Sequence, residues 1–144
     1  MEYTTRIEQL LPHAPPMVLI DSIIEHSDAH IVCQTNSHLD GDNPLRSDGV
    51  MSVFVGIEYA AQAMAIHTRL CSQGASPNTP RKGVIAVASK LTAHTQQLDD
   101  FPQPLQVRTD IIAQTADSSL CSFAISAGAQ TVLEGQLTAL VMDD

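Results

Sequence analysis

The chain has little positive charge. Its 144 residues include seven lysine and arginine residues against sixteen aspartate and glutamate residues, which gives a net charge of −9 at pH 7. Nucleic acids and anionic membrane surfaces are bound mainly through clustered lysine and arginine. The composition therefore argues against both as partners, and an acidic protein could dock only on a local basic patch.

Long apolar runs, a basic leader and paired cysteines are also missing. The most apolar stretch, residues 53–70, is interrupted by Glu58, Gln62 and His67, so no membrane span is expected. The first ten residues lack a basic segment followed by an apolar one, which predicts no signal peptide. Three widely spaced cysteines, each in an apolar stretch, indicate reduced core thiols in a cytoplasmic protein.

Signals for a bound cofactor are absent as well. The sequence has no glycine-rich phosphate loop, so no nucleotide cofactor is expected. His26 and His30 are four residues apart, but on an expected hairpin, where this spacing does not converge on a metal ion. With 44% hydrophobic residues, the chain is expected to form one globular domain, residues 1–144, with a sizeable core.

The order of apolar and turn-forming segments predicts an α+β fold. A helix that is apolar on every side must be surrounded by other elements, and sequential strands with short turns favour an antiparallel sheet. A curled sheet wrapped around one long central helix satisfies both requirements. The chain is expected to begin with a short helix started by Thr5 and Glu8, followed by a strand over 17–24, a turn at Ser27–Asp28 and a strand over 30–35. The central helix is expected over about 53–72, between loops at 37–52 and 75–83. Four further strands are expected, over 84–93, 105–115, 119–127 and 131–142.

One carboxylate, that of Glu58, lies inside the otherwise apolar segment expected to form the central helix. Glu58 and Gln62 are one helical turn apart inside the apolar helix. A glutamate buried there must be paired or protonated, and burial raises the pKa of a carboxyl group. A carboxyl group with a raised pKa can act as a general acid or base near neutral pH. Glu58 is therefore the first candidate catalytic residue, with Gln62 placed to orient it or a water molecule.

Three segments resemble a known family. LPHAPPMVLID at 11–21 and GIEYAAQAM at 56–64 are similar to segments of the bacterial 3-hydroxyacyl-acyl carrier protein dehydratases, the FabA/FabZ group of the hotdog fold. AGAQTVLEG at 127–135 is similar to a strand of a closer subgroup, the predicted dehydratases found with aryl-polyene-type biosynthetic clusters. The resemblance covers nearly the whole chain and implies a hotdog fold.

The chain departs from this family at the usual catalytic histidine. In the FabA/FabZ group that histidine lies in a GHFPG segment before the helix, and an alignment without gaps on Glu58 places it at Pro44. Two histidines remain as candidate bases. His13 lies between prolines in a rigid loop, which fixes its direction, whereas its rival His38 begins the HLDGD segment at 38–42, which matches HFPGD only if an insertion follows.

The resemblance implies dehydration of a 3-hydroxyacyl thioester, carried on acyl carrier protein, to the trans-2-enoyl thioester. A histidine would take the proton alpha to the thioester, and Glu58 would protonate the departing hydroxyl. The helix N-terminus near Val53 and Phe54 would offer N–H donors to the enolate. Arg81 and Lys82 could meet a phosphopantetheine phosphate or the acidic carrier protein.

Two alternatives stay open. Hotdog thioesterases commonly activate water with a helix carboxylate and need no histidine base. A non-catalytic acyl-binding or partner subunit of a dehydratase heterodimer would also fit the missing histidine. The resemblance further implies a homodimer, or a heterodimer with a related hotdog subunit, with no cofactor of its own, because the substrate is carried on phosphopantetheine.

Overall fold

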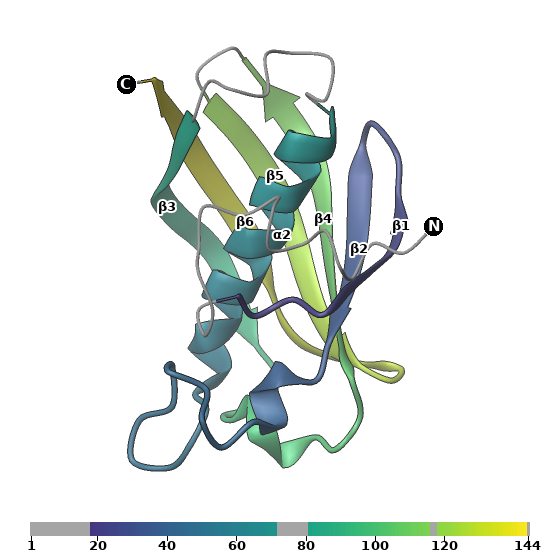
Figure 1. The fold of residues 1–144 in the computed structure, drawn as a ribbon, viewed down its shortest axis with the longest axis vertical. Helices are drawn as coiled ribbons and strands as arrows, with labels where there is room; N and C mark the ends of the chain where they lie inside the picture. The colour runs from purple at the N-terminus through teal and green to yellow at the C-terminus, as the bar shows by residue number, and fades with distance from the viewer. Residues whose placement is uncertain (1–17, 72–80, 116–117, 144) are drawn as a thin grey trace.

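The computed structural model describes residues 18–71, 81–115 and 118–143. Six strands form one antiparallel sheet in the order β1-β2-β4-β5-β6-β3, and the sheet curls around a single long helix (Figure 1). The strands are β1 (Ser22–His26), β2 (His30–Thr35), β3 (Arg81–Ala93), β4 (Leu105–Gln114), β5 (Ser118–Ala127) and β6 (Gln130–Asp143); the helix is α2 (Gly56–Cys71), and the short 3-10 segments are η2 (Ser37–Leu39), η3 (Val53–Val55) and η4 (Leu98–Asp100). The expected curled sheet around a central helix is confirmed.

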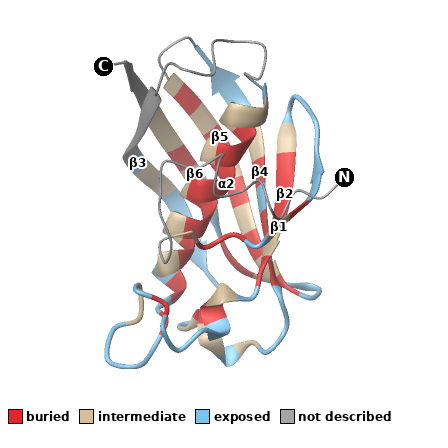
Figure 2. Ribbon diagram, viewed as in Figure 1, coloured by how far each residue is buried: buried red, intermediate tan, exposed pale blue. Residues whose placement is uncertain are grey.

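The core lies between α2 and the inner face of the sheet. Alternate residues of β5 are buried, from Ser119 to Ala127, as expected for a strand with one face against a helix (Figure 2). Along α2 itself, no residue from Gly56 to Leu70 is exposed. The helix is therefore surrounded by other elements, as its apolar sequence requires.

The start of α2 lies very close to the sheet. A Cβ atom added at Gly56 would be 2.6 Å from Cδ1 of Ile125 on β5 and 2.9 Å from Cδ2 of Leu133 on β6. Both distances are shorter than a carbon–carbon contact allows, so a larger residue fits only if Ile125 and Leu133 shift. This contact fixes how close the first turn of α2, which carries Glu58, lies to the sheet.

Several sequence expectations need correction at their boundaries. The strand expected over 17–24 begins only at Ser22, because the main chain of Leu19 is bonded to side chains and not to a neighbouring strand. Arg81 and Lys82, expected in a loop, begin β3 and pair with β6. Cys71, expected in the core, is exposed at the end of α2, whereas Cys33 and Cys121 are buried. Burial raises the pKa of Cys33 to about 12.

Other expectations agree with the structure or lie outside it. The turn between β1 and β2 contains Ser27 and Asp28, as expected, and the Ser27 N–H donates to the His30 carbonyl. The short helix expected to begin at Thr5 falls outside the described residues. Among the described helices, none is long and apolar enough to cross a bilayer.

Candidate functional site

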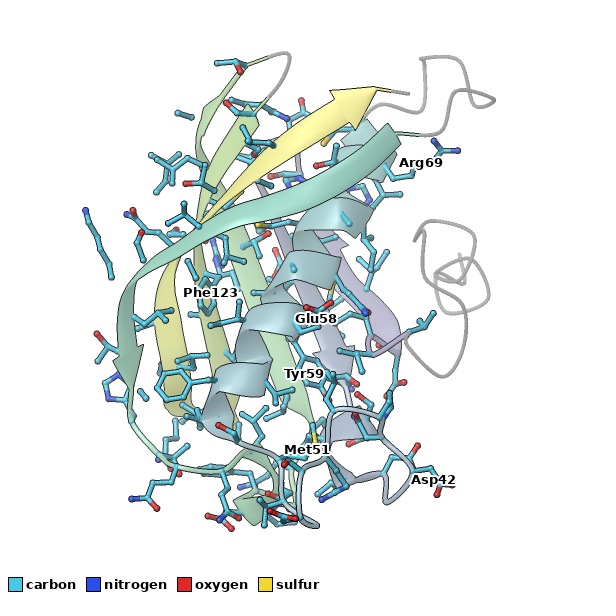
Figure 3. All side chains as sticks on the ribbon, turned by 90° about the vertical axis from the view of Figure 1, so that its left-hand side faces the viewer. Asp42, Met51, Glu58, Tyr59, Arg69 and Phe123 are labelled. Atoms are coloured by element: carbon cyan, nitrogen blue, oxygen red, sulfur yellow. The ribbon has the colours of Figure 1, made fainter. Side chains whose placement is uncertain are left out.

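Glu58 lies in the first turn of α2 (Figure 3). A negative side chain is favoured there, because the unpaired N–H groups and the dipole at a helix N-terminus attract an anion. Its side chain is half-buried, not fully buried as the sequence had suggested. The fold therefore leaves part of this residue accessible.

Gln62, one turn further along α2, is fully buried. Its Oε1 accepts a hydrogen bond of 2.8 Å from the main-chain N–H of Leu19, in the segment that leads into β1. We had expected Gln62 to orient Glu58 or a water molecule. The contact with Leu19 shows that its oxygen instead fastens a distant segment to the helix.

Tyr59 links the helix to the loop that precedes it, and the sequence had given no role to this residue. Its hydroxyl is buried, lies 2.8 Å from Oγ of Ser37 and accepts a 3.2 Å bond from Nδ2 of Asn43. Burial raises the pKa of Tyr59, and the bonds from Ser37 and Asn43 oppose this shift. The only sequence signal was a tyrosine beside Glu58 in the GIEYAAQAM segment.

Arg46 and Asp99 hold the rest of that loop, and the sequence missed this pair too. Nη1 of Arg46 lies 3.0 Å from Oδ2 of Asp99, while its Nε and Nη2 donate to the main-chain oxygens of Asp40 and His38. Oδ1 of Asp99 accepts from the N–H of Met51. Burial alone would raise the pKa of Asp99, but these donors hold it below its usual value. The pair therefore fixes the chain just before α2.

His38 is buried on the side of η4. Its Nε2 donates to the carbonyl of Phe101 at 2.8 Å, and the residue has no exposed surface. Burial lowers the pKa of His38, although the Phe101 carbonyl opposes this shift. Among the described residues, Nδ1 of His38 has no hydrogen-bond partner. In this arrangement neither ring nitrogen is reachable by a substrate, so His38 fits a structural role better than that of a base.

The remaining candidates are placed as follows. His13 lies outside the described residues, and so do the side chains of Arg81 and Lys82. The N–H of Val53 donates to the Gln96 carbonyl at 2.9 Å, and the N–H of Phe54 donates to Oγ of Ser52. An enolate oxygen would have to compete with these acceptors, so the structure does not favour the expected pair of donors.

The other histidines also have contacts within the fold. His67 is buried because the β1–β2 turn covers this part of α2, and its Nε2 donates to the Ser27 carbonyl at 2.7 Å. His94 is exposed next to β3, 2.9 Å from a carboxylate oxygen of Glu134. In the part of the chain that the structure describes, no three His, Cys, Asp or Glu side chains are grouped to hold a metal ion.

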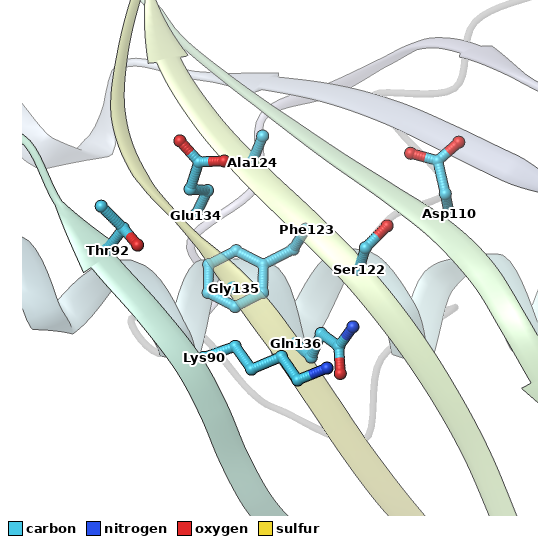
Figure 4. A pocket seen from close by; sticks show the side chains of 9 residues that line it. All are labelled: Lys90, Thr92, Asp110, Ser122, Phe123, Ala124, Glu134, Gly135 and Gln136. Atoms are coloured by element: carbon cyan, nitrogen blue, oxygen red, sulfur yellow. The ribbon is translucent and has the colours of Figure 1, made fainter.

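A shallow hollow of about 320 Å³ lies over the strands, with α2 behind them (Figure 4). Lys90, Asp110 and Glu134 are among the side chains that line it, and none of its lining residues belongs to α2. It is therefore separate from Glu58, and we do not assign the reaction to it.

A curled antiparallel sheet around one central helix defines the hotdog fold, and solved structures share it. The protein is similar to a chain of the dehydratase heterocomplex ApeI:P from Xenorhabdus doucetiae, with a TM-score of 0.84 and 20% identity over 96% of this chain and 91% of that one. It is also similar to a mutant thioesterase from Pseudomonas aeruginosa, with a TM-score of 0.68 and 10% identity over 98% and 94%. A thioesterase from Haemophilus influenzae gives a TM-score of 0.68 and 14% identity over 99% and 92%.

The sequence decides which hotdog family this is. The model of the ApeP-like family, described as ApeP dehydratase, matches residues 5–144, and the chain belongs to that family. No curated protein matches the chain. The resemblance to hotdog dehydratases of the aryl-polyene type is therefore confirmed.

Proposed function

We propose that the protein takes part in the dehydration of 3-hydroxyacyl thioesters, carried on acyl carrier protein, to trans-2-enoyl thioesters in fatty-acid or aryl-polyene-type biosynthesis. The observation that carries this proposal is the family match over residues 5–144, with Glu58 in the first turn of the central helix. A substrate thioester is reactive by itself, so the protein needs no cofactor of its own beyond the phosphopantetheine that carries the acyl chain.

In the proposed reaction a base removes the proton alpha to the thioester carbonyl. The electron pair forms the new double bond as the carbon–oxygen bond at the 3-position breaks. Glu58, in its protonated form, gives its proton to the departing hydroxyl, which leaves as water. The position of Glu58 supports this role, because the residue lies in the first turn of the central helix and is not fully buried.

The histidines of the described fold are not the proposed base. The rings of His30, His38, His67 and His94 each have a hydrogen-bond partner within that fold, and His26 ends β1 in the exposed hairpin. We therefore propose His13 as the base, or else an imidazole supplied by a partner subunit. The FabA/FabZ-type position is Pro44 and offers no alternative.

A second hotdog subunit is the proposed partner. β3 is thirteen residues long and forms one edge of the sheet, paired with β6 on one side only in the described fold. An edge strand of this length presents a row of main-chain donors and acceptors that another chain can pair with. The similar structure from Xenorhabdus doucetiae is a heterocomplex, which favours a related but different subunit over a second copy.

Hydrolysis of the thioester is the second candidate. The missing family histidine favours it, because a carboxylate such as Glu58 can activate water without an imidazole. The test is to purify the protein both alone and as its native complex, and to incubate each with 3-hydroxyacyl and 2-enoyl carrier proteins. Mass spectrometry would show loss or gain of water for a dehydratase and release of free acid for a thioesterase. Activity of the complex with none from the chain alone would support a base from the partner.

A further inference from the structure

Three histidines from three elements come together where the β1–β2 turn lies against α2. His67 on α2 is 2% exposed, and its Nε2 donates to the Ser27 carbonyl in the turn at 2.7 Å. His26 ends β1 and His30 begins β2, on either side of Ser27, whose Oγ lies 2.8 Å from Nδ1 of His30. The cluster does not include Glu58 and is separate from the proposed reaction.

Few side chains of this hairpin tip are buried in the described fold. β1 is an edge strand, and Ile23 is its one buried side chain. Every residue from Ile24 to Ala29 is exposed. The turn is bonded to β4 through the Ala29 carbonyl, which accepts from the N–H of Ile111 at 2.8 Å. The bond from His67 to Ser27 is therefore a main attachment of the tip to the helix.

The charges around His67 do not favour a proton on its ring. Burial lowers the pKa of His67, the Ser27 carbonyl opposes this shift, and the neighbouring histidines lower the pKa further. Asp110 is already paired with Arg108 at 2.9 Å, which leaves it less free to balance a new charge. The titratable groups that act on His67 come from the turn, β2 and β4: His26, Asp28, His30 and Asp110.

We propose that the β1–β2 turn is an acid-sensitive latch, closed on a neutral His67 at pH 7 and released when His67 is protonated at a pH below the ordinary histidine value of about 6.5. A second proton on the His67 ring would place a charge in a buried position beneath the turn. Opening of the turn lets water reach the ring, and the lightly packed hairpin tip is the part that can move.

His30 is held by contacts inside the hairpin tip. Its Nδ1 lies 2.8 Å from Oγ of Ser27, and its Nε2 lies 3.0 Å from a carboxylate oxygen of Glu25. These contacts do not involve α2, so opening of the latch leaves them in place and breaks the bond between His67 and the Ser27 carbonyl.

The test is hydrogen–deuterium exchange of the whole protein at pH 7.5 and 5.5, with rates corrected for the intrinsic effect of pH. In the wild type, we expect protection of amides in residues 22–31 to fall at least about tenfold relative to β5 at the lower pH. His67→Gln keeps a donor for the Ser27 carbonyl but cannot be protonated, so its hairpin should keep its protection. His94→Gln, a change at an exposed histidine beside Glu134, should behave as the wild type does.

Equal hairpin protection at both pH values in the wild type would overturn the latch, and so would an unchanged loss of protection in His67→Gln. If His67→Gln does not fold, the wild type can be titrated by NMR of its histidine rings. A His67 ring that titrates below about pH 6.5, together with shifts of the Ser27 and Ala29 amides, would support the latch. A ring that titrates at or above that value would refute it.

Discussion

The side-chain oxygen of Gln62 accepts the main-chain N–H of Leu19 at 2.8 Å, which ties the middle of α2 to the segment before β1. Both residues are buried, so this donor has no access to water. Glu58 lies one turn before Gln62, and the bond therefore holds the entry to β1 beside the helix that carries the candidate catalytic group.

Replacing Gln62 by leucine should destabilise the fold. The change leaves the buried N–H of Leu19 without an acceptor, which costs about 1–3 kcal/mol. Urea unfolding followed by circular dichroism would measure the loss. Gln106→Leu makes the same substitution at an exposed position of β4 and should stay within about 0.5 kcal/mol of the wild type. Equal stability of the two variants would contradict the role given to Gln62.

Removing Arg46 should loosen the loop before α2. Arg46→Ala deletes a largely buried guanidinium bonded to Asp99 and to three main-chain oxygens, and we expect a loss of about 1.5–3 kcal/mol. Arg108→Ala removes an arginine from an exposed pair with Asp110 and should cost less than about 1 kcal/mol. Thermal unfolding of both variants at low and moderate salt makes the comparison. A larger loss from Arg108→Ala would show that the loop is held by something other than Arg46.

Adding one methyl group at the start of α2 should also be costly. Gly56→Ala places a Cβ 2.6 Å from Ile125 and 2.9 Å from Leu133, and such overpacking costs about 1–3 kcal/mol. Gly41→Ala meets nothing within 4 Å and serves as the control. Because the clash with Ile125 is at its Cδ1, Gly56→Ala combined with Ile125→Val should recover part of the loss. Denaturant midpoints of the four proteins check this, and an unaltered midpoint in Gly56→Ala would mean that α2 can shift away from the sheet.

Stability should depend on pH through His38. Burial holds the pKa of His38 in the folded protein below the ordinary value of about 6.5, which applies to the unfolded chain. At a pH between the folded and the unfolded pKa, the unfolded chain binds more protons than the folded one. Stability therefore rises with pH across that window and is lost as the pH falls below about 6.5. In His38→Gln this part of the pH dependence should disappear, even if the variant is less stable at every pH. Denaturant unfolding at several values between pH 5 and 7.5 tests it, and parallel curves for variant and wild type would exclude His38 as a source.

Glu58→Gln should keep the fold but abolish turnover of 3-hydroxyacyl carrier protein. Glutamine fills nearly the same volume and removes only the ionisable group, so the proposed proton donor is lost. Glu134→Gln changes an exposed glutamate on β6 and should leave the activity unchanged. Product analysis by mass spectrometry on the native complex provides the measurement. Full activity of a folded Glu58→Gln protein would remove Glu58 from the reaction.

The sequence by itself determined the architecture and the central candidate. A strand alternates with period two and a helix packs with period 3.6, so the residues of α2, β4, β5 and β6 carry their own structural signal. The expected ends of these four elements differ from the structure by no more than a few residues, apart from the separate 3-10 segment that begins at Val53. The motif around Glu58 is also one continuous segment, GIEYAAQAM at 56–64, and its resemblance to hotdog dehydratases indicated the family.

Only the tertiary structure decided what the isolated polar residues do. Gln62 bonds Leu19, His38 bonds Phe101 and Arg46 bonds Asp99, over separations of 43, 63 and 53 residues. No local pattern encodes such a contact, because the partner depends on how distant segments are brought together by packing. For the same reason His67 is covered by a turn forty residues away, which its local sequence does not indicate.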